Sequence, residues 1–281
     1  MYVYFPDIHL RNQTFCFIPH FYYVPYYSCP YPHYVNSVTR NGGYRQKVQI
    51  GYIHGDNVPI WKLPSKNAFF FVGKMAIDAD GSPRAYHPQN KGLDDITNAG
   101  RPGNWYGILT HNGKPNGRPL IQKQTDPAPG YYISQTALID SSKERTDPRA
   151  YVNSEEIPYF VLPPNNPMGA QLGDYGVVIN LLNNKLSYAI FADIGPRNKI
   201  GEGSIALAKK LGINPDPRKG GTEKKNIFYL VFPKSGKGNG YIPNLDEINK
   251  NGEQLLTEWG GLEQVKSVIN NRNNYSHLNY K

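Results

Sequence analysis

Short apolar runs followed by turn-forming residues dominate the middle of the chain. The clearest are residues 68–78 (AFFFVGKMAID), 131–139 (YYISQTALI), 159–163 (YFVLP) and 226–233 (NIFYLVFP). Aromatic and β-branched residues, which favour strands, are frequent in these runs. The chain also contains 28 Gly, 24 Pro and 22 Tyr, a composition that favours turns and strands over long helices. We therefore predict a strand in each run.

The segment 176–193 (GVVINLLNNKLSYAIFAD) carries the best hairpin pattern in the sequence. Its two β-rich runs flank Asn183 and Asn184, and asparagine tolerates the positive φ angle that tight hairpin turns require. Residues 82–130, in contrast, are rich in Gly, Pro and Asn and predict a long stretch of loops.

Helical patterns are short and lie towards the C-terminal end. One short helix is predicted over residues 204–212 (SIALAKKLG), which place apolar residues on one face and end in Gly212. Terminal helices are predicted to start at residues 244–247 (NLDE), which resemble a capping box, and to be interrupted at Gly260-Gly261. The sum predicts a mainly β (α+β) fold, namely a compact β-barrel-like domain with short peripheral and C-terminal helices. The order strand, Asp, loop, helix also resembles double-psi β-barrels, as an analogy only.

Composition and charge narrow the class of protein. The 281 residues are 39% hydrophobic with a mean hydropathy of −0.58, which is typical of a soluble globular protein. No apolar run approaches the roughly 20 residues of a membrane span. The formal net charge of +9 invites an anionic partner. The basic residues are scattered without a binding motif, however, so we do not expect nucleic acid as a partner. The oligomeric state is not predicted.

The N-terminal region differs from the rest. Residues 1–46 are dense in Tyr and Pro and predict an irregular arm, followed by one domain over 47–270 and a tail over 271–281. Cys16 and Cys29 both fall in this arm, where one disulfide can form, and their pattern does not fit a zinc site. No signal peptide is readable, so the compartment is not predicted.

Two acids stand nine positions apart in FADIGPRNKIGEGS, Asp193 and Glu202. The turn at Gly195-Pro196 allows both to face one cleft, and glycoside hydrolysis needs two such carboxyl groups. The alternative is structural, with Asp193 in a turn and Glu202 complementing a helix dipole. Spacing alone favours the structural alternative.

Other motifs are weaker. The run GEGSIA fits G-x-G-x-x-A, but no strand directly precedes it, which disfavours dinucleotide binding. The residues after Asp78 and Asp80 do not complete a calcium-binding loop. The two roles left for these acids are turn formation and contact with a substrate. The histidines form no metal-binding motif, and there is no G-x-S-x-G elbow of a serine hydrolase. We therefore expect no metal and no cofactor.

Residues 173–217 resemble the signature region of glycoside hydrolase family 75, the chitosanases described first from fungi. The shared features are a hairpin that begins with Gly-Asp, the turn Asp-x-Gly-Pro within the run FADIGP, and the run I-G-E-x-S before a helix. Ala192 stands where the family commonly has Gly. Residues 75–81 (MAIDADG) match less closely, and the whole resemblance spans roughly residues 65–235.

The resemblance implies that residues 47–270 form a chitosanase-like catalytic domain. Its catalytic pair would be Asp193 and Glu202, and Asp78, Asp80 and Asp174 would contact the substrate. The implied reaction is endo-acting, inverting hydrolysis of β-1,4 links in chitosan or partly acetylated chitosan, by a secreted enzyme. The alternatives are a non-catalytic carbohydrate- or cell-wall-binding protein on the same fold and a binder of nucleic acid or anionic surfaces.

The location of the two acids suggests their roles. Glu202, near a helix N-terminus, is expected to be held ionised as the base. Asp193, at a strand end among apolar residues, is expected to have a raised pKa and to act as the acid. The reverse assignment is nearly as well supported. Because chitosan is a polycation, the cleft of a chain with a charge of +9 must be locally acidic.

Overall fold

The computed structural model describes residues 34–35 and 47–270. All of the described residues belong to one compact unit. The predicted C-terminal tail, both cysteines and nearly all of the predicted N-terminal arm lie outside the described residues.

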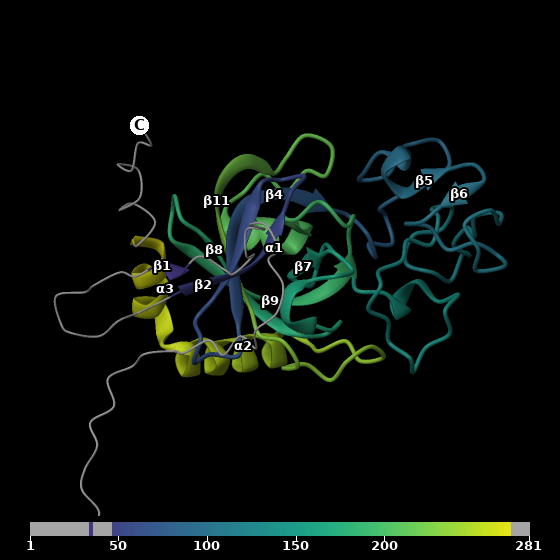
Figure 1. Cartoon of the computed structure of the whole chain (residues 1–281). Coiled ribbons are helices and arrows are strands. Elements are labelled where there is room, and N and C mark those ends of the chain that lie inside the picture. Colours follow the sequence, from purple (N-terminus) through teal and green to yellow (C-terminus); the bar gives the residue numbers. More distant parts are fainter. Residues whose placement is uncertain (1–33, 36–46, 271–281) are drawn as a thin grey trace, which may run out of the picture. The chain divides into compact units, whose positions relative to one another are not determined.

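Most of the strands form one main sheet that closes on itself, and β5 and β6 pair only with each other (Figure 1). The strands are β1 (Tyr34–Val35), β2 (Lys47–Ile53), β3 (Val58–Lys62), β4 (Phe69–Asp78), β5 (Gly100–Arg101), β6 (Asn104–Trp105), β7 (Tyr159–Leu162), β8 (Tyr175–Asn180), β9 (Lys185–Ile194), β10 (Glu202–Ser204) and β11 (Thr222–Val231). The sheet order is β1-β2-β3-β4-β10-β7-β9-β8-β11, and β11 also pairs with β4. Strands β4, β10, β7, β9, β8 and β11 therefore form a closed six-stranded barrel, and the predicted mainly β, barrel-like fold is confirmed.

The helices begin and end at the residues that the sequence indicates. They are α1 (Ile205–Leu211), α2 (Leu245–Trp259) and α3 (Gly261–Asn270). Ser204 caps α1 by accepting a hydrogen bond from the Leu207 N–H, and Gly212 ends it with a φ of 67°. The predicted interruption at Gly260 separates α2 from α3. Among the described residues, no helix combines the length and the apolarity that crossing a membrane requires.

The period of two along β4 separates two cores. Phe71 points into the barrel, where its ring stacks on Tyr229 of β11 at a centroid distance of 4.6 Å. Phe70 points the other way and meets Trp259 at the end of α2, at 6.0 Å. Full burial of such a ring contributes about 1.5–3 kcal/mol. The barrel is therefore filled inside and covered outside by α2 and α3.

The segment between β4 and β7, residues 79–158, contains little regular structure. It includes the short helical turns η1 (Ile96–Ala99) and η2 (Pro148–Ala150), and a third turn, η3 (Pro167–Gly169), follows β7. The prediction of a strand over residues 131–139 is wrong. Its residues form single bridges to three separate partners, Ile121, Ile108 and Tyr151, so no continuous ladder develops.

Candidate active site

Four carboxyl groups meet at one end of the barrel strands. Asp78 ends β4, and Asp80 follows after one residue. β10 runs parallel to β4 and begins at Glu202, while β9 carries Asp193 just before its last residue. Because β7 alone separates β9 from β10 in the sheet, these acids come together from distant parts of the sequence. All four line a hollow of about 750 Å³, here called the larger hollow.

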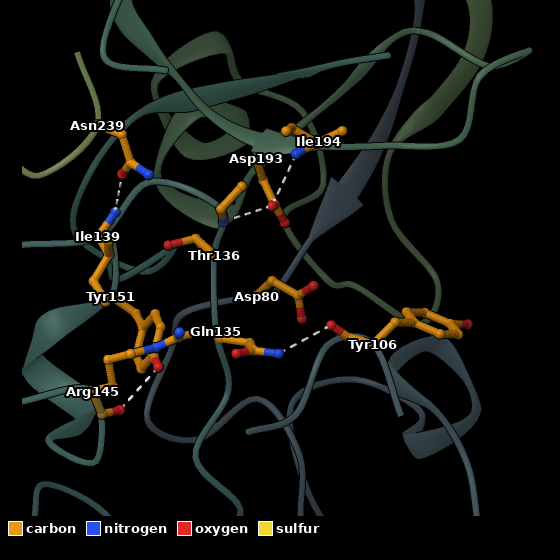
Figure 2. A pocket seen from close by; sticks show the side chains of 11 residues that line it. Asp80, Tyr106, Gln135, Thr136, Ile139, Arg145, Tyr151, Asp193, Ile194 and Asn239 are labelled. Atoms are coloured by element: carbon orange, nitrogen blue, oxygen red, sulfur yellow. Dashed lines mark hydrogen bonds between the residues drawn. The ribbon is translucent and has the colours of Figure 1, made fainter. Parts of the chain in front are cut away.

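A second hollow of about 480 Å³, here called the smaller hollow, adjoins the first. Asp80, Tyr106, Asp193 and Ile194 line both of them. Figure 2 looks into the smaller hollow and shows the Asp193 carboxylate directed towards Asp80. These shared residues mark the place where the two hollows join.

Three of the carboxyl groups are close enough to interact directly. One oxygen each of Asp78, Asp80 and Asp193 lies within 4.8 Å of the other two. The Asp78 carboxylate accepts a hydrogen bond from the Asp80 N–H (2.8 Å), and the Asp80 carboxylate accepts one from the Ser134 hydroxyl (3.2 Å). Like charges at this range repel, so such a trio either holds a cation or retains protons.

Asp193 is anchored by backbone donors from the barrel and from the loop segment. Its Oδ1 accepts hydrogen bonds from the N–H groups of Ala137 (2.8 Å) and Ile194 (2.9 Å). Burial raises the pKa of Asp193 to about 8, the charge of Asp78 adds to the rise, and the two N–H donors oppose it. The direction agrees with the raised pKa expected from the sequence.

Glu202 differs from its sequence-based expectation. It stands in β10, and Ser204, not Glu202, caps the following helix. Burial raises the pKa of Glu202 to about 8, and the charges of Asp78 and Asp193 add to this rise. The expected low pKa is therefore wrong, because burial and neighbouring acids outweigh the dipole of a short helix.

The remaining two acids complete a coupled group. Burial raises the pKa of Asp80 well above its usual range, with the charges of Asp78 and Asp193 adding to the effect. Burial also raises the pKa of Asp78 to about 6. The Tyr159 hydroxyl donates to the backbone carbonyl of Asp80 (3.0 Å) and fixes the chain there. Interacting acids of this kind titrate as a set, so protonated and ionised carboxyl groups stand side by side near neutral pH.

A family model described as fungal chitosanase of glycosyl hydrolase group 75 matches residues 75–255. The match covers more than half of the chain and includes the four acids of the site. The chain belongs to glycosyl hydrolase group 75. It is therefore a glycosidase, and a polysaccharide is its expected class of substrate. A search of curated proteins gave no match.

The structure does not bring Asp174 of this glycosyl hydrolase to the site. Its side chain is buried, and its carboxylate accepts hydrogen bonds from the N–H groups of Gln171 (2.7 Å), Lys234 (2.9 Å) and Gly236 (2.9 Å). It lines neither hollow. Asp174 thus joins two loops, and the contact with substrate expected from the sequence is replaced by a structural role.

Sequence reasoning missed several residues that line the hydrolase site. Tyr106 lines both hollows, Arg145 lines the smaller one, and Asp56 and Glu223 line the larger one. Tyr106 and Arg145 belong to the loop segment and stand in no recognisable motif. The high number of Tyr residues, 22 in the chain, did not single out Tyr106.

Proposed function

We propose that this glycosyl hydrolase cleaves the β-1,4 links of chitosan or partly acetylated chitosan from within the polymer and with inversion, using Asp193 and Glu202. The observation that carries the proposal is the convergence of both acids with Asp78 and Asp80 on the wall of a hollow that continues into a second one. A polymer needs such an extended surface on both sides of the bond that breaks. We also propose that residues 47–270 act as one catalytic domain.

The charge of the larger hollow suits a cationic polymer. Its lining includes the acids Asp56, Asp78, Asp80, Asp94, Asp193, Glu202 and Glu223 and the lysines Lys74 and Lys199. Lys74 pairs with Asp56 (3.3 Å) and Glu223 (3.4 Å), which leaves the acids at the centre to face the cleft. The site is therefore locally acidic although the chain carries a formal charge of +9.

Hydrogen bonding favours Glu202 as the acid and Asp193 as the base, the reverse of the assignment preferred from sequence. Two N–H donors stabilise the ionised form of Asp193. The Glu202 carboxyl accepts no hydrogen bond within the described part of the chain, and three neighbouring acids favour its protonated form. We therefore assign Glu202 as the acid and Asp193, whose ionised form these two N–H groups stabilise, as the base.

The reaction then proceeds in one displacement. Glu202 donates its proton to the glycosidic oxygen as the bond from that oxygen to the anomeric carbon breaks. Asp193 takes a proton from a water molecule, which attacks the anomeric carbon from the opposite face. The positive charge that develops on the sugar ring is stabilised by the ionised members of the acid group. Inversion requires roughly 6.5–9.5 Å between the two carboxyl groups to admit the water.

The test measures reducing ends released from fully deacetylated chitosan by wild type, Asp193→Asn and Glu202→Gln. Because each variant removes one proton-transfer group, we expect about a 10²–10⁴-fold loss of rate. Glu263→Gln is the matched control, since Glu263 is exposed on α3 and pairs with Lys266 outside both hollows. NMR of the first product should show the α-anomer, the mark of inversion.

Two outcomes contradict the proposal. If both single variants hydrolyse chitosan as fast as wild type while remaining folded, the catalytic pair is wrong. If wild type binds chitosan but releases no reducing ends, the protein is the non-catalytic carbohydrate binder that the sequence left open.

A further inference from the structure

A hairpin that precedes the family match reaches the candidate active site. Strands β2 and β3 pair antiparallel, and the turn between them, residues 54–57, includes Asn57 with a φ of 53°. The match covers residues 75–255, so membership of the family assigns no role to this hairpin. Neither of its strands belongs to the six-stranded barrel. Asp56 in the turn nevertheless lines the larger hollow, so the hairpin contributes an acid to the site.

Residues 195–201, here called the connecting loop, join the two proposed catalytic acids. The connecting loop follows β9, which carries Asp193, and ends directly before Glu202, the first residue of β10. Its last carbonyl, at Gly201, accepts a hydrogen bond from the Ala76 N–H of β4 (2.9 Å). Because Glu202 is the next residue, the position of the connecting loop determines where the Glu202 carboxyl stands.

Asp56 links the connecting loop to the barrel. Its Oδ2 accepts a hydrogen bond from the Ile200 N–H (2.7 Å), two residues before Glu202. Its Oδ1 lies 3.3 Å from the Lys74 Nζ of β4, and the Asp56 side chain is only 10% exposed. In the part of the chain that the structure describes, no other side chain hydrogen-bonds to the backbone of the connecting loop. Asp56 therefore supplies the one side-chain anchor of this loop.

The turn of the hairpin also contacts the connecting loop through the backbone. A Cβ at Gly55 would lie 2.1 Å from the Asn198 carbonyl oxygen, so the close approach depends on glycine. Ile53 and Val58, which flank the turn, belong to the same buried apolar cluster as Ile200. The hairpin thus supports the connecting loop by packing as well as by the Asp56 carboxylate.

Loss of the Asp56 carboxylate would release the connecting loop. Ile200 is buried, and a buried N–H group without an acceptor is unfavourable, so the backbone would move to find one. The movement would be passed directly to Glu202. A catalytic group displaced by about 1 Å can lower the rate of reaction about 10²-fold.

We propose that Asp56 is a positioning residue of this glycosyl hydrolase, which keeps Glu202 in place by holding the connecting loop. The inference rests on the proposed catalytic roles of Asp193 and Glu202, and it makes the hairpin of β2 and β3 part of the active site. Asp56 acts through the connecting loop and takes no part in proton transfer.

The experiment measures kcat and KM for the release of reducing ends from fully deacetylated chitosan. Asp56→Ala removes the acceptor of the Ile200 N–H, so we expect kcat to fall about 10–100-fold. Asp56→Asn removes the charge but keeps an acceptor oxygen, so its kcat should fall by no more than about fivefold. Both variants remove one negative charge from the larger hollow, so any rise in KM should be common to both. Rescue of kcat without rescue of KM distinguishes positioning from a contribution of charge.

Gly55→Ala tests the same contact without removing a charge or a hydrogen-bonding side chain. Its Cβ pushes the turn away from the connecting loop, so kcat should fall about 10-fold or more. Asp126→Ala is the matched control. The Asp126 carboxylate also accepts a backbone hydrogen bond of 2.7 Å, from the Lys123 N–H, but Asp126 lines neither hollow. Its kcat and KM should equal those of wild type under conditions where urea unfolding shows every variant to be folded.

The inference is overturned if Asp56→Ala or Gly55→Ala keeps the kcat of wild type, or if Asp56→Asn loses as much kcat as Asp56→Ala. Glu202→Gln in the same assay separates the two proposals. If Glu202→Gln is inactive while Asp56→Ala keeps the kcat of wild type, only the inference fails. If Glu202→Gln hydrolyses chitosan as fast as wild type, the proposed catalytic pair is wrong and the inference fails with it.

Discussion

The barrel wall and the loop segment 79–158 face each other across the candidate site but are held together differently. The barrel depends on strand ladders and a continuous apolar core. The loop segment depends on single bridges and on buried polar side chains. Thr136 is an example, since its hydroxyl donates to the Leu138 carbonyl and accepts from the Val152 N–H. The wall therefore carries three of the four acids on rigid strands, while the loop segment supplies much of the surface that a polymer would touch.

The junction between these two regions gives the largest expected effect. Gly81 directly follows Asp80 and has a φ of 76°, and a Cβ there would lie 2.0 Å from the Val152 carbonyl oxygen. Gly81→Ala therefore forces the loop segment away from the barrel as well as straining the backbone. We expect a loss of about 3 kcal/mol or more in the free energy of unfolding, measured by urea denaturation, and a large loss of hydrolysis.

Gly130→Ala is the control for that change. Gly130 also lies in the loop segment, has a φ of 87° and has no atom within 4 Å of its Cβ position. Only backbone strain remains, so we expect a loss of about 1–2 kcal/mol. Equal losses for the two variants would show that the close approach at Gly81 does not hold the loop segment in place.

The sequence predicted the barrel side far better than the loop side. Apolar runs predict β4 and both strands of the β8–β9 hairpin. The Asn183-Asn184 pair predicts the hairpin turn, where Asn184 has a φ of 59°. Their signals are local. The run 131–139 looks the same by composition, but its partners lie in three different parts of the loop segment, and no local pattern encodes that arrangement.

The site shows the same division. The family resemblance singled out Asp193 and Glu202, which spacing alone did not, and the environment of Glu202 follows from the strand order β4-β10-β7-β9. That order buries Glu202 and brings it near Asp78, more than a hundred positions away, and burial together with the Asp78 charge outweighs the local helix dipole. Asp174 is a case in which the sequence suggested a site residue and the structure shows another role. Its carboxylate accepts hydrogen bonds from three N–H groups, and no local pattern in the sequence predicts these contacts.

The acids on the barrel wall should reduce stability as the pH rises. The pKa of Glu202 is about 8 in the folded protein and is ordinarily 4.5. Between these values the folded state keeps a proton that the unfolded chain releases, so the free energy of unfolding falls with increasing pH. Glu202→Gln removes this penalty. After allowance for solvent screening in the hollow, the variant should be more stable than wild type at pH 8 by on the order of 1–3 kcal/mol.

Thermal or urea unfolding at several pH values checks this expectation. The advantage of Glu202→Gln should shrink as the pH falls and disappear near pH 4, where the wild-type group is protonated in both states. Glu263→Gln, on the exposed face of α3, should show no such trend. A pH-independent difference for Glu202→Gln would mean that packing, not titration, distinguishes it from wild type.

On the loop side, Tyr106 should contribute to binding rather than to chemistry. Its ring is 61% exposed, lines both hollows and is fixed by a hydrogen bond from its hydroxyl to the Thr97 carbonyl (3.3 Å). Sugar rings stack on such faces, and a stacked ring contributes about 0.5–1.5 kcal/mol beyond its buried area. Tyr106→Ala should therefore raise KM for chitosan about 3–10-fold with a smaller change in kcat.

Tyr106→Phe separates the ring from its hydroxyl and should stay within about twofold of wild type, because the stacking face is kept. Tyr52→Ala is the control, since Tyr52 is also exposed but lines neither hollow, and its KM should not change. A fall in kcat at constant KM for Tyr106→Ala would contradict the assignment of binding to the loop segment and chemistry to the barrel. It would mean that the loop segment takes part in the transition state together with the barrel acids.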